Sequence, residues 1–226
     1  MRGKVTDETW NLLNKSMSKI MNHNETQATQ DRYDRIAPLY NVMEVMPELI
    51  YKRWRKQIWS SVEGERVLEI GIGTGKNIPY YPADANMFAV DLSSKMLRRA
   101  QQKATDNNYD VEISQMDAQV LGLKSSIVDT VVTTFVFCSV PNPVIALEEI
   151  KRVLKPDGKV ILLEHMRSKY DVLGKVMDVL DPIVHRLTGP HINRETVANV
   201  KNAGLTVYTV KELDPFGIFR MVYAKK

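Results

Sequence analysis

The chain of 226 residues is 44% hydrophobic and 26% charged, with a net charge of +4 and a single cysteine, Cys138. One cysteine excludes a disulfide framework and a cysteine-rich metal site, which favours a reducing, cytoplasmic setting. No run approaches the roughly 18 apolar residues of a membrane-spanning helix, and the polar N-terminus is unlike a signal peptide. We expect one α/β domain with an N-terminal extension, either cytoplasmic or peripheral on the inner membrane face.

The first 62 residues contain no strand pattern and predict a helical extension or lid. A first helix is expected from Thr6, then a polar gap around residues 23–31, then a second helical region over residues 33–58. In the first helix one apolar stripe recurs at spacings of three and four: Trp10, Leu13, Met17, Ile20 and Met21. Both the stripe and the basic segment 52–56 (KRWRK) fit contact with an anionic membrane surface. The alternative for the stripe is a lid packed on the chain's own domain, and the alternative for the basic segment is a solvated helix face.

Residues 63–226 form the predicted second region, in which short apolar runs alternate with helical patterns. This alternation is typical of a mostly parallel sheet with helices between its strands. Strands are expected at 66–70, 87–91, 111–115, 130–135, 159–164, 206–211 and 219–224, and helices at 94–107, 143–154 and 194–203. Residues 155–158 (KPDG) predict a helix stop and a turn before the fifth strand.

A glycine-rich turn follows the first strand, at Gly71, Gly73 and Gly75, and Asp91 ends the second strand. In a parallel sheet, such a turn lies where ligands bind, and the carboxylate can accept hydrogen bonds from a ribose. Two common phosphate-binding loops are excluded by neighbouring residues. A dinucleotide loop needs glycine at Lys76, and a P-loop needs glycine at residue 70 and Ser or Thr at residue 77, where the chain has Ile and Asn.

The run Glu69-x-Gly71-x-Gly73-x-Gly75, followed by Asp91, resembles the cofactor motif of class I S-adenosylmethionine (SAM)-dependent methyltransferases. Further segments match in order: 116–118 (MDA), 135–140 (FVFCSV) and 154–159 (LKPDGK), in which Asp replaces the family's first glycine. The resemblance covers roughly residues 30–226. It implies a Rossmann-like, seven-stranded sheet that is mostly parallel with the last strand antiparallel, helices on both faces, and an N-terminal helical extension.

The resemblance implies SAM as the cofactor and assigns residues to it. The glycine loop would hold the methionine part, Asp91 the ribose and Asp117 the adenine amine, while Phe135 would open toward the methyl group. The predicted cofactor-binding residues are Tyr33, Glu69, Gly71, Gly73, Thr74, Gly75, Asp91, Leu92, Met96, Asp117, Ala118 and Phe135.

Two residues are candidates for the reaction itself. His165, after the fifth strand, is expected at the pocket mouth as a base or acceptor-orienting group, with a structural histidine as the alternative. Tyr40 ends the segment 33–40 (YDRIAPLY), which resembles the cofactor-covering segment of quinone methyltransferases; its alternative is core packing. No metal is expected, because the histidines have no compact ligand spacing, and Cys138 is expected to be a buried hydrophobe.

The segment after the fifth strand bears on the acceptor. Residues 164–168, 179–182, 186–189 and 193–196 resemble phospholipid N-methyltransferases and the methyltransferase-like thiol methyltransferases. We expect direct in-line N-methylation of a phosphatidylethanolamine-type lipid, with peripheral contact to an anionic membrane. Thiol S-methylation, quinone C-methylation and a non-catalytic SAM-binding regulatory module are the alternatives. Nucleic acid is not expected as a partner, because a net charge of +4 is too slight for a strong phosphate footprint.

Overall fold

The structure, a computed structural model, describes residues 24–38, 40 and 45–226. The expected first helix and its stripe lie outside the described residues. A helix over residues 24–38 precedes α2 (Val45–Trp59), so the polar gap expected around residues 23–31 is wrong from residue 24 on. Tertiary contacts compensate for the weak apolar pattern of this helix, since its Asp34 accepts hydrogen bonds from Ser93 Oγ at 2.5 Å and Lys95 N at 3.1 Å.

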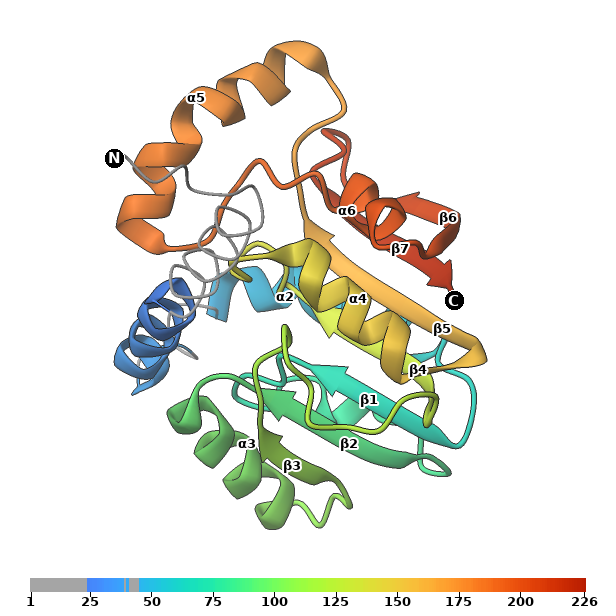
Figure 1. Cartoon of the computed structure of the whole chain (residues 1–226). Coiled ribbons are helices and arrows are strands. Elements are labelled where there is room, and N and C mark those ends of the chain that lie inside the picture. The colour runs from blue at the N-terminus through green and yellow to red at the C-terminus, as the bar shows by residue number, and fades with distance from the viewer. Residues whose placement is uncertain (1–23, 39, 41–44) are drawn as a thin grey trace, which may run out of the picture.

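Seven strands form one sheet in the order β3-β2-β1-β4-β5-β7-β6 (Figure 1). β7 runs antiparallel to both β5 and β6, and the other neighbouring pairs are parallel. The strands are β1 (Arg66–Ile70), β2 (Asn86–Asp91), β3 (Glu112–Gln115), β4 (Val128–Thr134), β5 (Leu154–His165), β6 (Thr206–Glu212) and β7 (Phe219–Lys225). This topology confirms the expected class I methyltransferase fold.

Helices cover both faces of the sheet, because side chains alternate along each buried strand. One face packs α4 (Pro143–Val153) and α6 (Thr196–Asn202) against strand residues that include Leu68 and Leu162. The other face packs α2 against residues that include Val67 and Leu163, and α3 (Ser94–Asp106) against Ala89. Because α2 buries Trp54 in this second layer, the extension predicted over residues 1–62 shares a core with the sheet. The boundary at residue 62 stays a prediction.

The turn predicted at residues 155–158 lies inside β5 rather than before it. Val128 pairs with Leu154 and Thr130 with Lys159, so the segment between them bulges out of the strand. Near the start of the domain, the short helix η1 (Ile78–Tyr80) completes the turn after β1.

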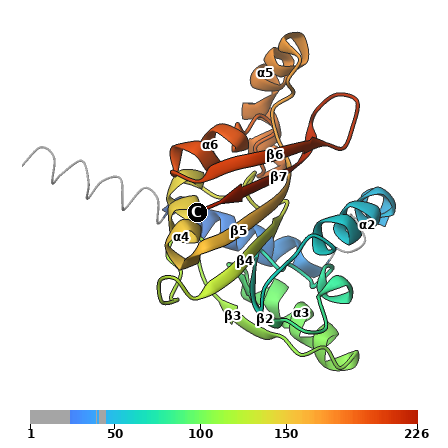
Figure 2. The ribbon, with the colours of Figure 1, turned by 90° about the vertical axis from the view of Figure 1, so that its right-hand side faces the viewer.

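α5 (Asp171–Thr188) is a helix that the sequence patterns do not predict. Pro182 lies in its interior, and many of its apolar side chains face outward instead of forming the buried stripe of an ordinary surface helix. α5 stands out from the sheet in both views (Figures 1 and 2). In the part of the chain that the structure describes, no helix is long and apolar enough to cross a membrane.

Candidate active site

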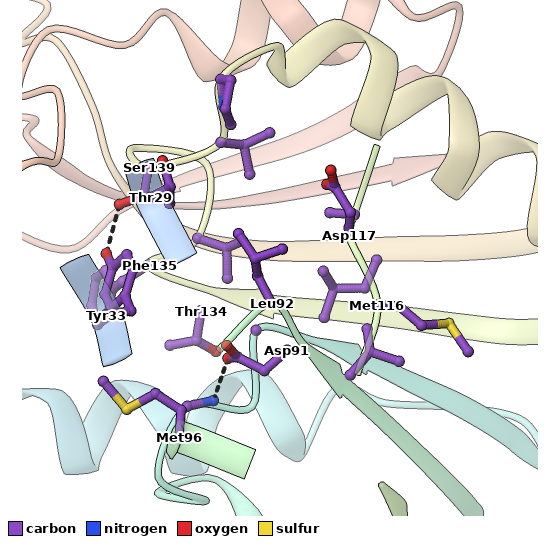
Figure 3. A pocket seen from close by; sticks show the side chains of 18 of the residues that line it. Thr29, Tyr33, Asp91, Leu92, Met96, Met116, Asp117, Thr134, Phe135 and Ser139 are labelled. Carbon is purple, nitrogen blue, oxygen red and sulfur yellow. Dashed lines mark hydrogen bonds between the residues drawn. The ribbon is translucent and has the colours of Figure 1, made fainter. Parts of the chain in front are cut away.

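A cavity opens at the carboxyl ends of β1, β2 and β4, with the helix over residues 24–38 forming part of its wall (Figure 3). Most of the predicted site residues line it: Tyr33, Tyr40, Gly71, Gly73, Asp91, Leu92, Met96, Asp117, Ala118 and Phe135. The wall also contains residues that the sequence did not single out for this role, among them Thr29, Thr134, Val136, Ser139 and Pro141.

The glycine turn after β1 needs its glycines for two different reasons. Gly71 has φ +76°, and a Cβ on it would lie 2.3 Å from Val136 Cγ2, so the turn after β4 closes directly against it. Gly73 has φ +55°, and nothing lies within 4 Å of where its Cβ would stand. The backbone at Gly73 therefore borders open space in the cavity, which a side chain would fill.

Asp91, the last residue of β2, joins two loops at the cavity wall (Figure 3). Its carboxylate accepts a hydrogen bond from Gly73 N at 2.8 Å and another from Ser93 N at 2.9 Å. Burial raises the pKa of Asp91, while these hydrogen bonds lower it. Two backbone donors leave lone pairs of the carboxylate available, so Asp91 is placed to accept from a further donor in the cavity.

Asp117 lies at the other end of the cavity wall, after β3. Its carboxylate accepts hydrogen bonds from Gln119 N at 2.9 Å and from Thr26 Oγ1 at 3.4 Å. Thr26 belongs to the helix over residues 24–38, so this contact ties that helix to the loop after β3. The arrangement fixes an acidic group at this end of the cavity.

Two tyrosines from the N-terminal helical region complete the wall. Tyr33 shares a hydrogen bond of 2.6 Å with Ser139 Oγ, which follows the turn after β4 (Figure 3). Tyr40 lies with its ring 5.7 Å from Lys76 Nζ. These contacts bring the region before α2 over the carboxyl ends of the strands, and a role in covering a bound ligand stays a prediction.

Three predicted cofactor residues lie outside the cavity lining. Glu69 is fully buried and accepts hydrogen bonds from Asn77 and Tyr81, and burial raises its pKa to about 7. Thr74 is also buried, and Gly75 packs against the following helical turn. Glu69 precedes the glycine loop and Thr74 and Gly75 form its end, and direct contact with a cofactor stays a prediction for all three.

His165 is the last residue of β5 and does not line the cavity. Its ring lies 5.9 Å from that of Phe219, which lies 6.1 Å from the ring of Phe135 in the cavity wall. Tyr51 and Trp54 of α2 stack on the same group. We call these five residues the aromatic cluster. Burial lowers the pKa of His165, which keeps its imidazole neutral near pH 7.

The turn after β4 contains a feature that sequence reasoning missed. Phe135 has φ +58°, a conformation that costs a bulky residue on the order of 1–3 kcal/mol. Glu164 of β5, fully buried, holds this turn by accepting hydrogen bonds from Val136 N at 3.1 Å, Phe137 N at 3.2 Å and Thr133 Oγ1 at 3.1 Å. Burial raises the pKa of Glu164 to about 7.

The basic segment 52–56 does not form one surface cluster. Lys52, Arg53 and Lys56 are exposed, whereas Trp54 and Arg55 are buried. Arg55 donates a hydrogen bond of 2.8 Å to Asn77 and pairs with Glu48. Helical spacing explains the division, because residues 54, 55 and 58 share the side that faces the sheet.

Cys138 is buried, and burial raises its pKa to about 12, so its thiol stays protonated near pH 7. Among the described residues, no group of three or more His, Cys, Asp or Glu side chains is placed to hold a metal ion.

A family model described as a methyltransferase domain matches residues 68–162. The phosphatidylethanolamine N-methyltransferase of Cereibacter sphaeroides is 30% identical over 161 residues, which are 70% of this chain and 79% of that protein. The thiol S-methyltransferase TMT1B of Rattus norvegicus is 32% identical over 61% of this chain and 58% of its own length. The ubiquinone/menaquinone biosynthesis C-methyltransferase UbiE of Teredinibacter turnerae is 27% identical over 76% of each chain.

Solved structures share the fold at lower identity. A SAM-dependent methyltransferase from Aquifex aeolicus aligns with a TM-score of 0.58 at 22% identity, over 86% of this chain and 97% of that one. The [4+2]-cyclase SpnF aligns with a TM-score of 0.74 at 17% identity, over 89% and 96%. Since this fold also carries a cyclase, the fold alone does not determine the reaction.

The lining of the cavity is chemically suited to SAM. Open space beside Gly73 leaves room for a ligand against the backbone, and Asp91 and Asp117 offer acceptors to ribose hydroxyls and to an adenine amine. When bound, SAM supplies a sulfonium whose methyl group is open to in-line attack. The protein's own part is to hold and orient the reactants and to exclude water. The similarity to the Cereibacter sphaeroides enzyme, over 79% of that protein, together with the shared fold, shows that the chain belongs to the class I SAM-dependent methyltransferases.

Proposed function

We propose that this enzyme methylates the amine of a phosphatidylethanolamine-type phospholipid. The ammonium of the acceptor first loses a proton to a base. The lone pair that this frees then attacks the methyl carbon, and the bond from that carbon to sulfur breaks with its electron pair left on sulfur, giving a methylammonium and a neutral thioether. Such an acceptor places the enzyme on the inner face of a membrane, as a peripheral protein of the cytoplasm. The similarity to the Cereibacter sphaeroides phosphatidylethanolamine N-methyltransferase supports this choice.

The observation that carries the proposal is the aromatic character of the cavity's edge. Tyr33, Tyr40 and Phe135 line the cavity, and the aromatic cluster continues outward from Phe135 to Tyr51, whose ring lies 4.6 Å away, and to Phe219. Aromatic faces attract cations within about 6 Å. Methylation of an ethanolamine nitrogen produces a cationic methylammonium, whereas a methylated thiol or quinone is neutral. The same faces suit the sulfonium of SAM.

His165, which belongs to the aromatic cluster without lining the cavity, is our candidate for the group that takes the acceptor's proton. An ethanolamine nitrogen is mostly protonated near pH 7 and must lose a proton to become a nucleophile. His165 is neutral, adjoins Phe219 in the aromatic cluster and therefore adjoins the side from which an acceptor would approach Phe135. We assign it the role of base or acceptor-orienting group, and Tyr40 that of closing the cavity over the cofactor.

Thiol S-methylation is the second candidate, favoured by the similarity to TMT1B. Quinone C-methylation is the third, favoured by the similarity to UbiE and by the segment 33–40. The three acceptors differ in where the methyl group is recovered, so one experiment separates them.

The test is transfer of labelled methyl from SAM to a total lipid extract that is then resolved into phospholipid and quinone fractions. Label in methylated ethanolamine lipids supports the proposal, and label in quinones contradicts it. No organic-phase label, from enzyme that binds SAM by calorimetry, contradicts it too and directs the search to thiols. Asp91→Ala is the matched control, since any genuine transfer falls with its SAM affinity.

A further inference from the structure

The inner face of α5 contacts the chain's own residues. Met177 is buried, and its sulfur accepts a hydrogen bond from Ser168 N at 3.4 Å. Asp181, also buried, accepts from Ile192 N at 2.7 Å and pairs with His191 Nδ1 at 2.8 Å. These contacts dock one side of α5 on the segments that flank it, and its opposite side faces outward.

The outer face of α5 is apolar. Six side chains on it are between 44% and 80% exposed: Val172, Val176, Val179, Leu180, Ile183 and Leu187. At 3.6 residues per turn they fall within an arc about 100° wide, and no other residue of the helix falls inside that arc. An unbroken apolar arc of this width is the pattern of a helix that buries the face against an apolar phase, and here it is turned away from the protein core.

Basic side chains run along one edge of this arc. Lys175 and Arg186 are exposed, and both lie just outside the apolar positions on the same edge. Aliphatic residues flanked by Lys and Arg are typical of helices that lie in the interface of an anionic membrane. α5 also stands out from the rest of the molecule, so a flat surface can reach it (Figures 1 and 2).

We infer that the outer face of α5 docks on the surface of an anionic phospholipid membrane. A second copy of the chain fits less well. If two copies packed their apolar arcs together with the two α5 helices antiparallel about a two-fold axis, Lys175 of one copy would lie opposite Arg186 of the other. Such a dimer places like charges together. Anionic headgroups instead complement both charges. The inference rests on the proposed function in one respect, since the docked lipid is also the source of the acceptor.

The test is flotation of the full chain with vesicles of phosphatidylcholine that contain about 30% phosphatidylglycerol. The variant Val179→Glu/Ile183→Glu places two carboxylates in the middle of the arc. Val120→Glu is the matched control, because Val120 is 72% exposed against 75% for Val179 and lies after β3 rather than on α5. We expect the double variant to bind vesicles at least about tenfold more weakly than wild type, and the control to bind like wild type.

A second variant tests the basic edge. Lys175→Gln/Arg186→Gln is expected to lose about fivefold in affinity for the anionic vesicles for each charge removed, with little change on pure phosphatidylcholine. Unaltered SAM affinity, measured by calorimetry, shows that each variant remains folded, as expected for substitutions at exposed positions.

Vesicle binding of Val179→Glu/Ile183→Glu equal to wild type overturns the inference. Light scattering then tells whether a second copy occupies the face, and deletion of residues 1–23 tells whether that segment does. Different results would contradict membrane docking and the proposed function. If wild type floats and the double variant does not, docking stands even when no label enters phosphatidylethanolamine. If both label a water-soluble, short-chain ethanolamine phospholipid and float equally, the function stands and docking is wrong.

Discussion

The proposed cofactor end of the cavity, at the turns after β1 and β2, and the proposed acceptor end, at the turn after β4, are held by different kinds of contact. At the cofactor end, Asp91 accepts from Gly73 N, 18 residues away, and from Ser93 N, two residues away. At the acceptor end, Glu164 of β5 holds the turn after β4 through hydrogen bonds that span 27 and 28 residues. The Asp91 contacts therefore lie within one recognisable sequence motif, whereas the Glu164 contacts join segments that no short motif covers.

The largest expected effect concerns the cofactor end. Asp91→Ala should weaken SAM binding by tens-fold without unfolding the domain, because it removes the carboxylate placed to accept from the ribose. Calorimetry measures the affinity, and thermal unfolding checks the fold. SAM affinity like that of wild type would remove the ribose assignment.

At the acceptor end, His165→Gln should lower kcat by about tenfold or more with SAM affinity retained. Because burial lowers the pKa of His165 below its ordinary value of 6.5, its neutral form persists to lower pH, and activity should fall only on acidification below that value. This acid limb should be absent from the pH–rate profile of the variant. An unchanged profile would leave His165 a structural residue.

A smaller effect is expected for Phe219→Leu, which removes one ring of the aromatic cluster but keeps an apolar side chain beside His165. The KM for an amine acceptor should rise by about fivefold, in the range of a lost cation–π contact. Val210→Leu, on the neighbouring strand β6, is the matched control. An equal rise in both variants would argue for a general loss of packing.

The smallest effect is on stability. Burial raises the pKa of Glu164 to about 7, while in the unfolded chain the group titrates near 4.5. Between these values the folded protein holds a proton that the unfolded chain releases, so the free energy of unfolding falls as pH rises through this window. Urea unfolding at about pH 5 and about pH 8 should show a decline that is smaller in Glu164→Gln by on the order of 1 kcal/mol. The same decline in both proteins would contradict the assignment.

The sheet and the glycine loop could be predicted because their signals are local. Strand alternation and the spacing from Gly71 to Asp91 lie within single βα units. The apolar residues of α5 do recur at helical spacing, but Pro182 within the segment argues against a helix there. That the apolar side faces outward depends on how the helix docks, which its sequence does not show. The helix over residues 24–38 depends on contacts such as Asp34 to Ser93.

The role of Glu164 could not be predicted from the sequence either. Its hydrogen-bond partners lie 27 to 31 residues away along the chain, where no short motif can record them. Alternation along β5 also explains why its neighbour His165 turns to the opposite face and joins Phe219 instead of the cavity wall.

The most direct test of this division is a side-by-side titration of SAM into wild type, Asp91→Ala and Phe219→Leu. If the cofactor end is separate from the acceptor end, Asp91→Ala should bind SAM tens-fold more weakly than wild type, and Phe219→Leu should bind SAM within about twofold of wild type. Equal losses in the two variants, or none in Asp91→Ala, would contradict it.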